Sequence, residues 1–256
     1  MSTLSEIVTG LTREGDAFTA TITDNWRQGR TAFGGISAAL CYEAAIRGIE
    51  DLPPLRSAQF AFPGPATGIV RATATTLRRG RSTAFINVDL VGEDGLAVHA
   101  LLCFGAARES ALHHKALAPP PVSAPAACPE AFTNRGPGFI GNFEVRDAHG
   151  DMKDPVRTLW LRHRDIAART SIAGLIALAD APPPSAINLF PKPGPVSTMT
   201  WMFDVLSDAP ASDDGWWLMH NVADTIEGGY SSQSSAMWNS EGSPIMIARQ
   251  NVAVFI

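Results

Sequence analysis

Residues 33–46, FGGISAALCYEAAI, form the stretch that decides the fold. The segment is rich in Ala, contains no Pro and opens on the glycine pair Gly34-Gly35. Side chains this small leave room for another backbone to come close. The pattern therefore predicts a buried helix that packs closely against a second element.

Strand-like segments flank this helix on both sides. Apolar and polar residues alternate along them, as in half-buried strands. Two of the breaks carry turn residues, Pro63-Gly64-Pro65 and Glu93-Asp94-Gly95. The order is therefore one strand, a long central helix and a run of antiparallel strands, with strands expected at 17–26, 55–62, 67–77, 81–92 and 96–107.

The same order occurs a second time. Residues 109–135 are rich in Pro, Ala and Ser, which favours an extended spacer. After them we expect strands at 138–147 and 156–163, a helix at 166–180, and strands at 196–206, 215–222, 230–238 and 244–255. An internal repeat of about 120 residues follows. We predict an α+β chain with an N-terminal unit (1–108), a linker (109–135) and a C-terminal unit (136–256).

Duplication has a physical reason. A single unit would leave one sheet edge and one helix face uncovered. Two units in one chain can pair edge to edge, giving a continuous sheet with two central helices on one side. We expect that arrangement here.

Composition narrows the classes of function. The 256 residues are 45% hydrophobic and 18% charged, with a net charge of −5, so a large core is expected and nucleic acid is a poor partner. No apolar run reaches the roughly 20 residues of a membrane span. The N-terminus lacks a signal-peptide layout, and three widely spaced cysteines suggest reduced thiols, so we expect a cytoplasmic protein. The pair His113-His114 has no further ligand at a suitable spacing, and no metal or cofactor is predicted.

Several short motifs carry a family resemblance. Phe33 to Leu40 is followed by LRSAQF (55–60) with Pro63-Gly64-Pro65, by LRRGRS (77–82), by Leu178-Ala179-Asp180 and by Ala248-Arg249-Gln250. In this order the chain resembles the thioesterase II family of acyl-CoA thioesterases, which are double hotdog proteins. The resemblance implies hydrolysis of acyl-CoA to a fatty acid and CoA without a cofactor, and a possible homo-oligomer.

The resemblance also implies site residues. The family's Asp and Gln correspond to Asp180 and Gln250, and its hydroxyl to Thr198, with Ser197 as second choice because a one-residue slip changes the sheet face. Where better-known members carry an Asp-His pair, this chain has Thr198-Met199-Thr200. Asp180 would take a proton from water held by Thr198 and Gln250. Backbone N–H groups near Gly34 and Gly35 would bind the oxyanion.

Substrate-binding residues are predicted at two places. Gly34 and Gly35 would lie against the thioester, and Arg78 and Arg81 would contact the CoA phosphates. From local sequence alone, Asp180 is equally well a turn residue before three prolines, and Arg78 and Arg81 could be solvated residues on a strand edge.

Three other functions compete with the thioesterase. An acyl-CoA or acyl-lipid binding protein could keep the hotdog cavity without catalysis. A hotdog hydratase would use Asp94 and His99, although the segment between them lacks the Asn-Pro of that motif. A serine hydrolase would use Ser37, but a polar and basic segment precedes it where a nucleophile elbow requires a hydrophobic strand.

Overall fold

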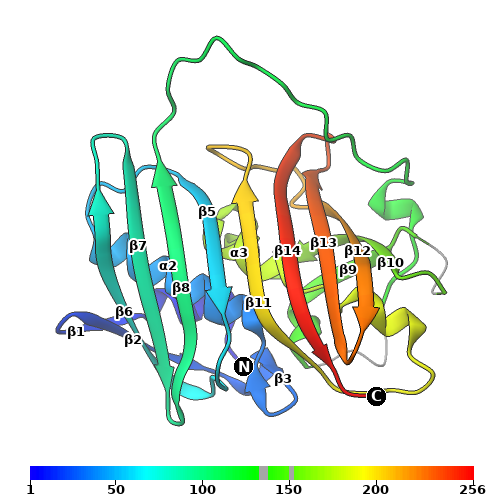
Figure 1. Cartoon of the computed structure of the whole chain (residues 1–256), viewed down its shortest axis with the longest axis horizontal. Helices are drawn as coiled ribbons and strands as arrows, with labels where there is room; N and C mark the ends of the chain where they lie inside the picture. The colour runs from blue at the N-terminus through cyan, green and yellow to red at the C-terminus, as the bar shows by residue number, and fades with distance from the viewer. Residues whose placement is uncertain (133–137, 150–152) are drawn as a thin grey trace.

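A computed structural model describes residues 1–132, 138–149 and 153–256. Within these ranges a 12-stranded antiparallel sheet carries the two main helices on one face (Figure 1). In the first half the helices and strands are α1 (Leu4–Thr9), β1 (Thr12–Glu14), β2 (Ala17–Ile22), the short pair β3 (Arg27–Gln28) and β4 (Thr31–Ala32), α2 (Gly34–Gly48), β5 (Leu55–Ala61), β6 (Gly68–Arg79), β7 (Thr83–Gly92) and β8 (Gly95–Gly105). In the second half they are β9 (Phe143–Asp147), β10 (Val156–His163), α3 (Ile172–Ala179), β11 (Val196–Val205), β12 (Trp217–Glu227), β13 (Tyr230–Asn239) and β14 (Pro244–Val254).

The strand order confirms the internal repeat. It reads β1-β2-β6-β7-β8-β5-β11-β14-β13-β12-β10-β9, so each half has the same order counted outward from its junction at β5 and β11. Those two strands pair antiparallel, with Trp201 opposite Phe60. The architecture is therefore the predicted double hotdog. The expected boundary between linker and second unit, at 135/136, lies outside the described residues.

The central helices approach each other closely, as the small side chains predict. Ten of the 15 residues of α2 are buried, most of them Ala, Gly or Ser. A Cβ on Gly35 would lie 2.7 Å from the carbonyl oxygen of Ala177 in α3, a distance that no side chain tolerates. Glycine at this position lets the two helix backbones come into contact.

Several predicted element bounds were wrong. The strand expected at 215–222 begins at Trp217 and continues to Glu227. The helix expected from residue 166 begins at Ile172, because Ser171 is extended and its hydroxyl caps the Gly174 N–H at 2.9 Å, while Ala167–Thr170 form a separate 3-10 turn. The strand expected from 138 begins at Phe143, after the 3-10 helix Gly138–Asn142. The strand expected to reach residue 26 ends at Ile22, and Asp24–Trp26 form a 3-10 turn that buries Trp26.

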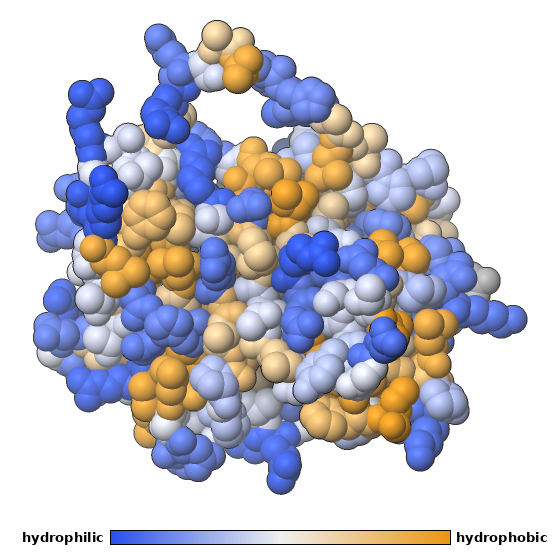
Figure 2. Space-filling view, in the orientation of Figure 1, coloured by the Kyte–Doolittle hydropathy of each residue, from blue (hydrophilic) through white to orange (hydrophobic). Residues whose placement is uncertain are grey.

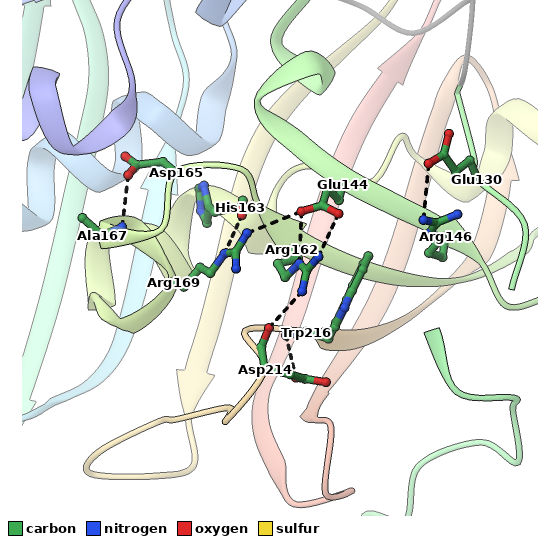
Figure 3. Close-up of polar contacts among 10 residues, drawn as sticks. All are labelled: Glu130, Glu144, Arg146, Arg162, His163, Asp165, Ala167, Arg169, Asp214 and Trp216. Atoms are coloured by element: carbon green, nitrogen blue, oxygen red, sulfur yellow. Dashed lines mark hydrogen bonds and ion pairs between the residues drawn. The ribbon is translucent and has the colours of Figure 1, made fainter. Parts of the chain in front are cut away.

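Helix α3 is anchored at its start by a partly buried polar network, and Figure 3 shows the bonds among His163, Arg162, Arg169 and Glu144. The ring Nε2–H of His163 on β10 donates to the carbonyl of Gly174 at 2.8 Å, and Arg169 Nε donates to the carbonyl of His163 at 2.8 Å. Burial lowers the pKa of His163 to about 4, so the ring is neutral at physiological pH. Arg162 and Arg169 both pair with Glu144, and hydrogen bonding from Arg162 helps to hold the pKa of Glu144 below its usual value.

The linker is held on the outer face of the second half. The indole N–H of Trp238 donates to the carbonyl of Leu117, and that of Trp160 to the carbonyl of Ser123. Both tryptophans belong to an outer cluster with Trp216 and Cys128 and lie away from the helices. Figure 2 looks onto this outer face, where apolar side chains alternate with polar ones. Within the described ranges, no helix has the length and apolar character that crossing a bilayer would require.

Candidate active site

A carboxylate lies where the end of one central helix meets the start of the other. Asp180 directly follows α3, and its carboxylate accepts a hydrogen bond from the backbone N–H of Gly35 in the first turn of α2. A Cβ on Gly34 would lie 2.8 Å from Asp180 Oδ2. Phe33, which precedes α2, offers no side-chain cap, so the N–H groups of this turn stay available to an anion. The glycine pair thus gives the carboxylate access to a helix N-terminus.

The structure brings Gln250 to the same carboxylate and Thr198 to Gln250. Gln250 Nε2 donates to Asp180 Oδ1 at 2.6 Å and makes a longer contact of 3.5 Å to Thr198 Oγ1. A bulge in β11 between Thr198 and Thr200 makes Met199 the additional residue. Thr198 is half-buried and faces the site, whereas Ser197 is exposed.

Burial raises the pKa of Asp180 to about 7, although the hydrogen bonds from Gln250 and Gly35 act in the opposite direction. The residue as a whole is only half-buried, so the site keeps an opening to solvent. At neutral pH the carboxylate is therefore present both as a base and as its conjugate acid. A carboxylate in this state can take a proton from water and return it.

The backbone N–H of Gly35 bonds to the Asp180 carboxylate and so helps to keep it ionised. That N–H groups near Gly34 and Gly35 bind the oxyanion of the substrate stays a prediction.

Gln233 is a site residue that the sequence reasoning missed. Its Nε2 donates to Gln250 Oε1, and its own Oε1 accepts from the backbone N–H of Ser185 at 3.1 Å. Gln233 is 2% exposed and stands directly opposite Gln250 in the sheet. Its place on the inward-facing side of the strand YSSQSSAMW was the available signal, since a buried amide requires a partner.

Aromatic rings form one wall beside the carboxylate. Trp201 is the cross-strand neighbour of Gln250 and packs on Phe60 and Phe203, with ring centroids 5.5 and 4.8 Å away. Phe62 continues this cluster and reaches Gly34, where an added Cβ would lie 3.3 Å from its ring. The wall is apolar and directly adjoins Asp180.

The predicted arginines lie at the other end of α2. Strand β6 begins near the start of α2, where the backbone N–H of Ala32 bonds to the carbonyl of Ala66. It ends at Arg79, whose guanidinium donates to the carbonyls of Glu50 and Asp51 just beyond α2. Arg78 and Arg81 are exposed at this end, so the structure places them roughly the length of α2, about 20 Å, from Asp180.

Among the described residues, the polar side chains of the site occur in the second half only. The register makes Leu55 the counterpart of Thr198, because each precedes a bulge, and Leu102 the counterpart of Gln250. Ile86 pairs with Leu102 as Gln233 pairs with Gln250. The corresponding acid is Glu43, nine residues into α2, and it pairs with Arg47 at 3.0 Å. Among the described residues, the first half thus lacks the amides and the hydroxyl.

The residues that a serine hydrolase or a hydratase would use lie outside the Asp180 site. Ser37 is 2% exposed within α2. His99 lies on the exposed side of β8, where its Nδ1 is 2.7 Å from Asp89 Oδ1, and Asp94 is in the turn before Gly95. No group of His, Cys, Asp and Glu side chains in the described part of the chain is arranged to hold a metal ion.

Family models decide the relationship of this chain to known proteins. Residues 22–105 match the acyl-CoA thioesterase N-terminal domain, and residues 118–254 match the acyl-CoA thioesterase C-terminal domain. The chain belongs to the acyl-CoA thioesterase family. In this thioesterase-family chain the two matched segments correspond to the two halves of the sheet. No curated protein sequence matched it.

Solved structures share the fold of this thioesterase-family chain along its whole length. A hotdog-fold protein of unknown function from Alicyclobacillus acidocaldarius is 24% identical, with a TM-score of 0.89 over 100% of this chain and 99% of that one. A thioesterase II from Thermobifida fusca, named as putative, is 15% identical, with a TM-score of 0.86 over 100% and 98%. An acyl-CoA thioesterase II from Mycobacterium marinum is 17% identical, with a TM-score of 0.79 over 98% and 97%. At these identities the likeness shows the fold alone.

Proposed function

We propose that this chain hydrolyses acyl-CoA thioesters to a fatty acid and CoA, with Asp180 as the general base. The observation that carries the proposal is the buried carboxylate of Asp180 with a pKa of about 7, held by Gln250 and by the first turn of α2. A base is most effective when its pKa lies near the operating pH, and such a base contributes a factor of roughly 10²–10⁴.

In the reaction, the ionised carboxylate takes one proton from water while the water oxygen bonds to the thioester carbon. The C–S bond then breaks, and CoA leaves as a thiolate, which is a good leaving group. The proton on Asp180 returns to the thiolate or to solvent. Thr198 keeps its hydroxyl proton for the attacking water, because in its contact with Gln250 the hydroxyl oxygen is the acceptor.

The aromatic wall suits an acyl group. In this proposal the half-buried Phe62 contacts the apolar part of the substrate next to the thioester, and the buried rings of Phe60 and Trp201 support it from behind. Arg78 and Arg81 remain the predicted contacts for the CoA phosphates. This requires the CoA moiety of the substrate to extend along α2. A CoA bound in that way would place its only charged groups at the exposed end of the helix.

Release of free thiol from a series of acyl-CoA chain lengths tests the proposal. We expect turnover by the natural chain and a loss of 10²–10⁴-fold in kcat for Asp180→Asn, with acyl-CoA binding retained. Ser37→Ala serves as the matched control, because Ser37 is buried in α2 away from solvent and should leave turnover unchanged. Binding of acyl-CoA without thiol release would instead identify a non-catalytic binding protein, and equal turnover in Asp180→Asn would remove this residue from the mechanism.

A further inference from the structure

A chain of hydrogen bonds runs from the backbone into the site. The N–H of Ser185 donates to Gln233 Oε1, Gln233 Nε2 donates to Gln250 Oε1, and Gln250 Nε2 donates to Asp180 Oδ1. Every donor in this chain points toward the carboxylate. Ser185 is fully buried and Gln233 is 2% exposed, so water does not substitute for these bonds.

The donor–acceptor direction of this series of hydrogen bonds is set at the Ser185 end, where the donor is a backbone N–H. A side-chain amide can turn by half a rotation and exchange its oxygen with its nitrogen, but a backbone N–H can only donate. Residues 182–184 are prolines without an N–H, and the N–H of Ala181 bonds to the carbonyl of Leu178. Ser185 is thus the first residue after the helix end with an N–H to offer, and its own hydroxyl is used on the carbonyl of Asn221.

Only one orientation of each side-chain amide gives every donor in this series of hydrogen bonds an acceptor. With the Ser185 N–H in place, Gln233 must present Oε1 to it and Nε2 to Gln250. Gln250 must then present Oε1 to Gln233 and Nε2 to Asp180. If Gln233 were reversed, its amino group would face the Ser185 N–H, leaving two buried donors unpaired at substantial cost.

We propose that Gln233 is a positioning residue, which fixes the orientation of the Gln250 amide so that its amino group faces the catalytic carboxylate. The inference rests on the proposed role of Asp180. Gln233 touches neither the carboxylate nor the reacting atoms; it acts through Gln250. Without it, Gln250 can present its carbonyl oxygen to Asp180 instead, which favours the protonated acid over the base.

The surroundings of Asp180 make this orientation decisive. Burial raises the pKa of the carboxyl, and the bonds from Gln250 and Gly35 oppose that rise. Among the described residues no charged side chain is a cause of the shift. The amino group of Gln250 is therefore one of two groups that keep the carboxylate ionised.

The test replaces Gln233 with a residue of similar size that cannot hydrogen-bond. Gln233→Met is compared with Ser231→Ala, a control two residues earlier on the same sheet face, whose buried hydroxyl has no hydrogen-bond partner among the described residues. The midpoint of Asp180 ionisation is followed by carboxyl ¹³C NMR, and the pH dependence of kcat by thiol release. We expect the midpoint to rise by about half to one pH unit in Gln233→Met, and kcat at pH 7 to fall roughly two- to fivefold with KM unchanged.

Coupling to Gln250 distinguishes positioning from a general packing defect. In a Gln250→Met background, the additional change Gln233→Met should have no further effect on the ionisation midpoint. If Gln233→Met does not fold, Gln233→Leu, which also lacks a donor and an acceptor, replaces it and should raise the midpoint in the same way. An unchanged midpoint in either variant, or additive effects in the double variant, would overturn the proposal. A moved midpoint in a protein that hydrolyses no acyl-CoA would leave the positioning role standing and refute the proposed function.

Discussion

The raised pKa of Asp180 predicts that this residue destabilises the fold at neutral and alkaline pH. Its pKa is about 7 in the folded chain against 3.8 for an ordinary aspartate. Because the folded state disfavours the ionised form, stability is highest below about pH 4, falls as the pH rises toward 7 and is constant above that. A difference of about three pH units corresponds to about 4 kcal/mol, and partial solvent exposure reduces this to about 2–4 kcal/mol.

Asp180→Asn removes this titration. Asn can accept from Gln250 but gives Gly35 a donor in place of an acceptor oxygen, so the absolute stability of the variant includes a cost that does not depend on pH. The informative quantity is therefore the pH dependence of the stability difference between Asp180→Asn and the natural chain. Between pH 4 and pH 8 this difference should move in favour of the variant by about 2–4 kcal/mol, or roughly 5–15 °C in Tm for a chain of this size.

Thermal and denaturant unfolding measured at steps from pH 4 to pH 8 provides the assay. The titration of His163 and of the other groups is common to both proteins and cancels in the difference. A stability difference that stays constant over this range would show that the folded chain does not raise the pKa of Asp180. Asp180 would then be an ordinary, weakly basic carboxylate at neutral pH and a poor general base.

Three further substitutions test the site and its counterpart. Gly34→Ala places a methyl group 2.8 Å from the Asp180 carboxylate and should lower kcat, measured by thiol release, at least tenfold with little change in Tm. A fully active variant would show that the carboxylate can move freely. Gln250→Glu places a second carboxyl beside Asp180 and should move the midpoint of the kcat–pH profile upward by a unit or more, whereas a downward move would contradict the assigned geometry. Arg47→Met leaves Glu43 buried without its partner and should lower the free energy of unfolding in urea at pH 7 by about 2–4 kcal/mol. Adding Glu43→Gln should recover part of this loss, and turnover should be unchanged, since lost turnover would mean that the first half also takes part in catalysis.

Much of the architecture follows from the local sequence of each segment. The Ala- and Gly-rich helix of residues 34–48, the alternating strands and the turn at Glu93-Asp94-Gly95 follow from side-chain size, period and backbone freedom, and the strand of residues 156–163 was predicted to the residue. The start of α3 was not, because the cap by Ser171 and the bond from His163 to Gly174 involve the three-dimensional path of the chain. Helix ends are decided by such contacts more than by composition.

The sequence by itself determined that two like units share one sheet, and its resemblance to a known family predicted the acid and the amide of the site. Only the tertiary structure decided how they act. Thr198 and not Ser197 contacts Gln250, the N–H of Gly35 bonds to Asp180, and Gln233 comes opposite Gln250. Register and burial arise between segments far apart in the chain, and a pKa or the direction of an amide depends on what those segments place around it.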